Sequence, residues 1–75
     1  MLKVKKNGDV IITIPGEFDV ENDIIRALGA IDVEVEKMNE PTAKFNHNDC
    51  DNRMIVMVFE VDGSQVFFTI EEVEG

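Results

Sequence analysis

Met54–Ile70, with the sequence MIVMVFEVDGSQVFFTI, consists of two apolar runs on either side of Asp62-Gly63. An Asp-Gly pair in this setting is typical of a two-residue hairpin loop, because both central residues of a type I′ turn take positive φ. The flanking runs are rich in valine, isoleucine and phenylalanine, which favour strands. We therefore predict a β-hairpin here, and we expect the rest of the chain to assemble around it.

A two-residue turn determines which residues of this hairpin share a face. One face is wholly apolar and is expected to pack under a helix; it consists of Ile55, Met57, Phe59, Val66, Phe68 and Ile70. The reverse face is half apolar, with Val56, Val58 and Phe67 adjacent. Strands that are apolar on both faces usually lie in a sheet that is covered on both sides. We therefore expect the first hairpin or a second molecule to cover the reverse face, where these three residues are candidate partner-binding residues.

Residues 2–14 predict another hairpin, around Asn7-Gly8. A two-residue loop would place Lys5 opposite Val10 and mix charge into the apolar face. A three-residue loop over residues 6–8 brings apolar partners together, pairing Leu2 with Ile12, Val4 with Val10, and Lys5 with Asp9. Because this register also gives Lys5 an opposite charge across the ladder, we favour the three-residue loop.

The segment after Pro15-Gly16 has the spacing of an amphipathic helix. Its apolar residues recur at intervals of three and four, at Val20, Ile24, Ala27, Leu28 and Ile31. Asp19 is a suitable N-cap and Gly29 a suitable stop, so we predict a short helix over residues 20–29. Residues 31–36 then alternate between apolar and acidic side chains, which is the pattern of a strand with one solvent-exposed face.

Residues 39–41, Asn-Glu-Pro, interrupt this pattern. A short strand over residues 42–45 and an exposed polar loop over residues 46–53 are predicted to follow. The expected fold is α+β, with a β-hairpin, one short helix and then three strands forming a mainly antiparallel sheet (ββαβββ). We expect the helix to pack on one face of the sheet, and residues 1–75 to form a single small domain.

The composition narrows the classes of partner. A chain of 75 residues has a small core, so oligomerisation or a partner often adds stability. Sixteen acidic residues against seven basic ones give a net charge of −9. Nucleic acids and anionic membranes repel such a chain, and we expect it to bind neither directly. The first residues lack the apolar segment of a secretory signal, and a single cysteine excludes internal disulfides, so we expect a cytoplasmic protein.

The polar loop holds the residues with the most reactive side chains. We predict no enzymatic activity and no cofactor, because a nucleophile needs a base that a third group holds in a sheltered cleft. The loop could offer N, O and S ligands to a metal, but zinc sites normally have a second ligand pair elsewhere. A small metal- or ligand-binding oligomer is therefore kept as an alternative, with candidate ligands His47, Asp49, Cys50 and Asp51.

Acidic residues suggest a second alternative. Along a strand, carboxylates at alternate positions lie ~6.7 Å apart, about twice the ~3.4 Å rise per phosphate of one DNA strand. Such a row could imitate a phosphate track and block a protein that binds DNA or RNA. The candidate acidic face consists of Asp32, Glu34 and Glu36 on the predicted strand, with Glu21 and Asp23 at the start of the helix.

The function that we favour from the sequence is a small acidic, non-enzymatic protein-binding module. It would act by self-association or by docking on a protein partner. The half-apolar reverse face supports this prediction, because one short helix cannot cover both faces of the sheet. Small accessory and inhibitor proteins, including phage-encoded ones, have this general build.

Overall fold

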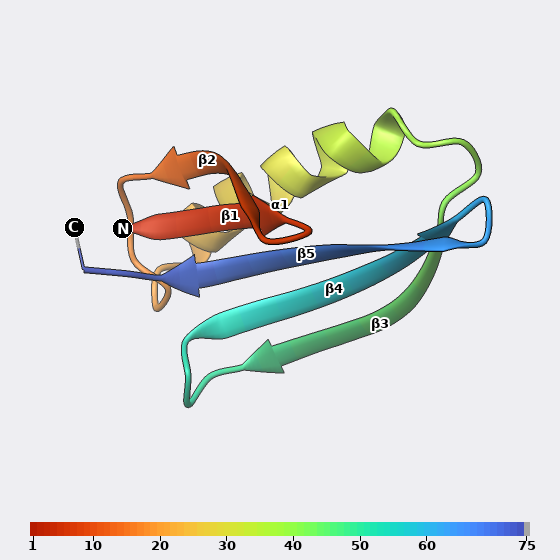
Figure 1. Ribbon diagram of the computed structural model, residues 1–75. Helices are drawn as coiled ribbons and strands as arrows, with labels where there is room; N and C mark the ends of the chain where they lie inside the picture. Colours follow the sequence, from red (N-terminus) through yellow and green to blue (C-terminus); the bar gives the residue numbers. More distant parts are fainter. Residues whose placement is uncertain (75) are drawn as a thin grey trace.

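The computed structural model describes residues 1–74, which form one five-stranded sheet with one helix against it (Figure 1). The elements are β1 (Leu2–Lys6), β2 (Asp9–Ile14), α1 (Glu21–Glu36), β3 (Thr42–Asp49), β4 (Met54–Val61) and β5 (Ser64–Glu72). The strands lie in the order β2-β1-β5-β4-β3, and all neighbours are antiparallel. This arrangement confirms the predicted ββαβββ fold. Within the described residues, no helix has both the length and the apolar content needed to cross a membrane.

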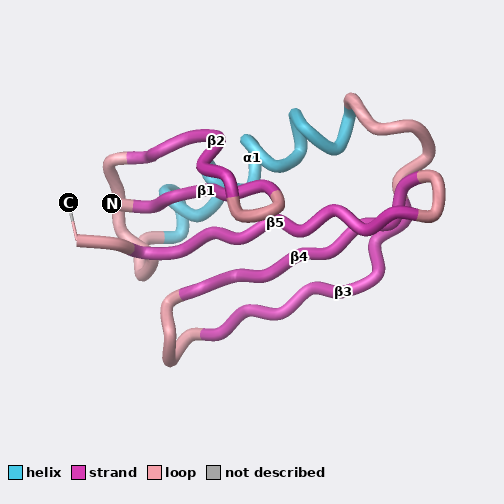
Figure 2. The backbone as a smooth tube through the Cα atoms, in the orientation of Figure 1, coloured by secondary structure: helices cyan, strands magenta, loops and turns pink. Residues whose placement is uncertain are grey.

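The hairpin of β4 and β5 has the predicted register. Asp62 and Gly63 have φ values of 51° and 80°, as a type I′ turn requires. The six residues predicted to form the wholly apolar face pair with one another, with Phe59 opposite Val66, Met57 opposite Phe68 and Ile55 opposite Ile70. Figure 2 shows the short loops that connect β1 with β2 and β4 with β5.

The three-residue loop predicted for the first hairpin is wrong. Asn7 and Gly8 have φ values of 50° and 88°, so they form a two-residue turn with Lys6 opposite Asp9. The register then shifts at a β-bulge, where Ile11 is the additional residue. Beyond the bulge Val4 lies opposite Ile12. Asn and Gly both tolerate the positive φ of the two-residue turn, so the loop needs no third residue. The extra residue that brings the apolar partners opposite each other lies inside β2 instead.

The helix is longer than predicted and replaces the strand expected over residues 31–36. α1 runs through Gly29, where a Cβ atom would meet nothing within 4 Å, and ends at Glu36. Ile31 is buried, whereas Val33 is 53% exposed. Over so few residues the alternating pattern also fits a helix, since Val35 lies four positions after Ile31 and continues the buried stripe. The predicted N-cap is also wrong, because Val20 occupies that position.

β3 is twice as long as the predicted strand and extends to Asp49, so the loop covers residues 50–53. Seven of its eight residues are exposed. An edge strand that is exposed on both faces needs no apolar alternation, so the sequence pattern did not indicate its length.

The core lies between α1 and the face of the sheet that we call the helix face. α1 packs over β1, β2 and β5. Phe68 is fully buried, and its ring meets Phe59 edge-on with centroids 5.9 Å apart. The other buried members of the cluster are Leu2, Val4, Ile14, Phe18, Ala27, Ile31, Ile55 and Ile70. The first hairpin lies beside β5 in the sheet rather than across the reverse face, so it does not supply the expected cover (Figure 1).

Gly29→Ala is expected to raise the free energy of unfolding by about 0.5–1 kcal/mol, because alanine loses less backbone entropy in a helix interior and has room here. Urea unfolding followed by circular dichroism measures the change. Gly63→Ala is the control, and it should lower stability because residue 63 has a φ of 80°. A loss of stability in Gly29→Ala would mean that the helix ends near residue 29.

Candidate functional site

The reverse face of the sheet, opposite α1, carries an apolar row that crosses three strands. Phe45 of β3 lies opposite Val58 of β4, which lies opposite Phe67 of β5. Val58 is 8% exposed, whereas Phe45 and Phe67 are 54% and 46% exposed. Val56 and Met54 are half-buried and continue the apolar surface along β4. We call these five residues the apolar patch.

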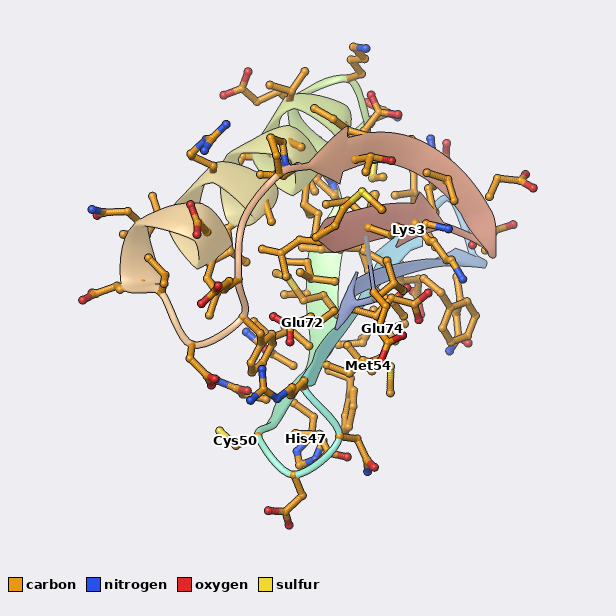
Figure 3. All side chains as sticks on the ribbon, turned by 90° about the vertical axis from the view of Figure 1, so that its left-hand side faces the viewer. Lys3, His47, Cys50, Met54, Glu72 and Glu74 are labelled. Carbon is orange, nitrogen blue, oxygen red and sulfur yellow. The ribbon has the colours of Figure 1, made fainter. Side chains whose placement is uncertain are left out.

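Polar and charged side chains surround the apolar patch. On the β1 side, Lys5 Nζ lies 2.6 Å from Glu71 Oε1. On the β3 side, the His47 ring lies opposite Val56, with its centroid 6.2 Å from that of Phe45. Figure 3, which looks along the strands, shows Lys3 and Met54 on the side of the sheet away from the helix. An apolar centre with a polar rim is the usual anatomy of a protein–protein interface.

Within residues 1–74, no helix or strand lies over the apolar patch (Figures 1 and 3). The residues predicted for this face, Val56, Val58 and Phe67, are all on it. Phe45 is an additional member that sequence reasoning missed. A register shift between Ala43 and Phe45 places its side chain opposite Val58, and the sequence gives no sign of that bulge.

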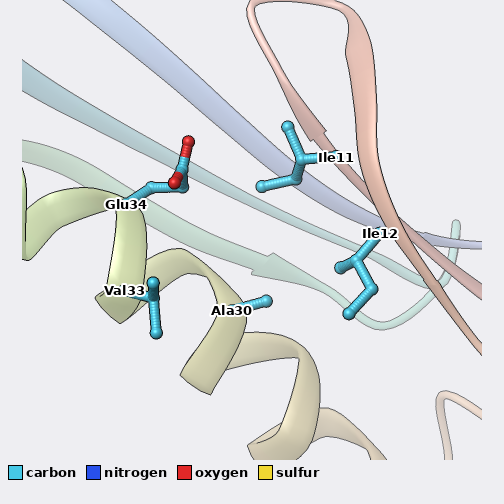
Figure 4. A pocket seen from close by; sticks show the side chains of 5 residues that line it. All are labelled: Ile11, Ile12, Ala30, Val33 and Glu34. Atoms are coloured by element: carbon cyan, nitrogen blue, oxygen red, sulfur yellow. The ribbon is translucent and has the colours of Figure 1, made fainter.

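A second apolar surface lies at the β2 edge of the sheet and was also missed. Val10, Ile11 and Ile12 are all exposed although each is aliphatic. Between β2 and α1 is a groove of about 400 Å³, lined by Ile11, Ile12, Ala30, Val33 and Glu34 (Figure 4). The run of consecutive aliphatic residues in β2 is a signal of a strand with two apolar faces, but the groove depends on how the helix lies over the sheet.

The acidic row predicted for a strand is absent, because its members lie on α1. Residues two positions apart in a helix are rotated by about 200° relative to each other. Glu34 therefore faces away from Asp32 and Glu36. Glu34 instead binds Lys37 at 3.1 Å and Lys6 at 3.6 Å, and the hydrogen bond from Lys37 lowers the pKa of Glu34. The prediction that Asp32, Glu34 and Glu36 form a row along a strand is therefore wrong.

The two acidic candidates at the start of α1 have structural contacts. Asp23 Oδ2 accepts a hydrogen bond from the backbone N–H of Glu17 at 2.9 Å, and its other oxygen lies 3.6 Å from Arg26. Glu21 is exposed in the first turn, where the partial positive charge of a helix favours a carboxylate. Both residues thus support the helix start, and they do not continue a row with the later acidic residues.

The candidate metal ligands are spread over the end of β3 and the following turn. In the described part of the chain, no three His, Cys, Asp or Glu side chains are grouped as a metal site requires. The side-chain amide of Asn52 donates to Asp49 Oδ2 at 2.7 Å and lowers the pKa of Asp49. Cys50 and Asp51 are exposed in the turn, and Cys50 Sγ lies 3.6 Å from Asn48 Oδ1. The Asp49 carboxylate, which accepts hydrogen bonds from Asn52, closes the turn.

A polar cluster joins the 50–53 turn, β5 and the segment before α1. Arg53 contacts Glu72 at 2.5 Å and Asp19 at 2.9 Å, and Glu72 Oε2 accepts a hydrogen bond from the backbone N–H of Phe18 at 2.7 Å. The bond from Phe18, followed by the interaction with Arg53, lowers the pKa of Glu72. Every charged group of the cluster has a partner, so the cluster serves as a structural link between β5, the 50–53 turn and the segment before α1.

Comparison of the chain with models of known families, with curated proteins and with solved structures found no match. The candidate functional surfaces are therefore the two apolar ones, the apolar patch on the reverse face and the β2 edge with its groove.

Glu72→Gln is expected to reduce stability at neutral pH. The folded-state pKa of Glu72 lies below its ordinary value of 4.5, so its ionised form stabilises the fold above that pH. This contribution is lost as the pH falls through the lowered pKa, and the difference between wild type and variant should shrink there. Urea unfolding at a series of pH values measures it, with Glu74→Gln as a control. A difference that does not change with pH would contradict the role of the ionised carboxylate.

Proposed function

We propose that the protein is a small, non-enzymatic binding module that acts by self-association, with the apolar patch as its binding surface. The observation that carries this proposal is the row of Phe45, Val58 and Phe67, in which both phenylalanine side chains remain about half exposed and no helix or strand of residues 1–74 lies over them. An exposed Cys50 fits a reducing compartment, and the proposal places the protein in the cytoplasm.

Burial of the apolar patch would supply a large part of the free energy that association requires. A phenylalanine buries about 150–250 Å² when it is fully covered. Phe45 and Phe67 are about half exposed. At ~25 cal/mol per Å², covering the rest of each ring contributes roughly 2–3 kcal/mol. Two copies would bury four such rings, which offsets much of the ~4–15 kcal/mol lost in association.

A second copy is the partner that suits the distribution of charge around the patch. Lys3 and Lys5 lie on its β1 side, and Asp49 lies on its β3 side. A two-fold axis along the strands would place Lys3 of one copy over Asp49 of the other, because the two residues lie at the same level of the sheet. The two sheets would then pack face to face, as the layers of a β-sandwich do.

Phe67→Thr and Phe45→Thr are expected to shift the protein toward a monomer, because each removes an aromatic ring from the patch but keeps a residue that favours strands. Light scattering and sedimentation equilibrium over a concentration series measure the mass. Ile25→Gln is the matched control, since Ile25 is 55% exposed on α1 and lies outside the patch. A wild type that is monomeric at its highest soluble concentration, or variants with unchanged mass, would exclude the proposal.

Added salt is expected to strengthen self-association, because each copy carries a net charge of −9 and the screening of this repulsion outweighs the screening of the lysine–aspartate contact between copies. The dissociation constant should fall when the ionic strength rises from ~0.01 M to ~0.15 M, over which the Debye length shortens from ~30 Å to ~8 Å. Docking on a basic partner would respond in the opposite direction. A dissociation constant that rises with salt would thus contradict self-association through the apolar patch.

A further inference from the structure

The two edges of the sheet differ in how they resist pairing with another strand. β3 has Lys44 at its bulge, and its other exposed residues are mostly polar. Lysine and bulges are common protections of an edge strand. β2 also has a bulge, but aliphatic side chains occupy it and its neighbours, at Val10, Ile11 and Ile12. The β2 edge is therefore open to a further strand, whereas the β3 edge is protected.

The groove next to β2 defines what an added strand must carry. Ile11 and Ile12 point toward Ala30 and Val33 of α1 across the groove (Figure 4). A strand paired with β2 would lie beneath this side of the helix, and its helix-facing side chains would enter the groove. On the reverse face it would meet Val10, which is 49% exposed. The incoming strand must therefore be aliphatic on both faces, as β2 itself is.

Repulsion between copies is weakest at this edge. β1, β2, and α1 with its C-cap hold five of the seven basic residues, Lys3, Lys5, Lys6, Arg26 and Lys37, but only six of the sixteen acidic ones. Glu34, the one acidic residue that lines the groove, already has Lys6 and Lys37 as partners. Two copies with a net charge of −9 should therefore repel each other less here than across the acidic remainder of the surface.

We propose that the free edge of β2 pairs with β2 of a second copy in antiparallel orientation, and that the two chains form one continuous sheet. The contact is isologous, because the same strand of each copy supplies the aliphatic side chains that cover the other. The proposal adds a second surface to the proposed function and rests on that function only in taking another copy as partner. The two-fold axis of this contact is perpendicular to the sheet, so the contact leaves the apolar patch free.

Ile12→Lys tests the proposal, because lysine on β2 would place a charge in the groove of the partner. Light scattering of the wild type should give a larger mass than the variant, by about a factor of two. Asn46→Lys is the matched control, since it adds the same charge to the β3 edge and should leave the mass unchanged. The added positive charge by itself would reduce the repulsion between acidic copies and favour association. A smaller mass for Ile12→Lys, but not for Asn46→Lys, would therefore show that the β2 edge is the contact.

Hydrogen exchange provides the second readout. Backbone amides of β2 should exchange more slowly as the wild-type concentration rises, whereas those of β3 should not change. Circular dichroism shows whether Ile12→Lys folds, and Ile12→Thr replaces it if it does not.

Comparison with Phe67→Thr separates this proposal from the proposed function. If Phe67→Thr lowers the mass and the β2 variants do not, the β2 contact is excluded and the proposed function stands. If the β2 variants alone lower the mass, the apolar patch is excluded and the β2 contact stands. A wild type that is monomeric, with rapidly exchanging β2 amides at every concentration, overturns both.

Discussion

A single layer of helix over a long sheet is the constraint on which the rest of the structure depends. In the described part of the chain, α1 has 16 residues, which corresponds to a length of ~24 Å. The sheet has five strands, and the molecule extends 35 Å along its longest axis. One helix can bury one face of such a sheet over part of its width. It lies over β1, β2 and β5, so the side chains that it covers form the core.

The position of the helix also explains where apolar side chains remain in solvent. The face away from α1 keeps Phe45 and Phe67 exposed, and the outer strand β2 keeps Val10 and Ile12 exposed. Most residues of both surfaces belong to β2, β4 and β5, which have apolar side chains on both of their faces. The chain thus has a well-packed centre and two surfaces with the composition of a core.

Sequence reasoning succeeded where the decisive signals were local. The register of β4 and β5 follows from Asp62-Gly63 and from the alternation on both sides of it. It failed at Gly29, because a glycine with room around it can continue a helix, and a short alternating run fits either period. The groove at β2 was beyond prediction, since Ile12 and Val33 are distant in sequence and meet through the packing of α1. Bulges at Ile11 and Lys44 shift strand registers without a recognisable local pattern.

The strand order has a consequence for the time course of folding. β5 is the central strand and lies between β1 and β4, yet it follows every other described element in the sequence and is therefore synthesised after them. β1 is therefore synthesised well before β5, the strand with which it pairs, as in the pairing of Lys6 with Phe68. Closing so long a loop before its contacts form is slow compared with the formation of a local hairpin. During synthesis the first hairpin and the helix exist without the strand that joins them to the rest, and the complete sheet forms when β5 is inserted.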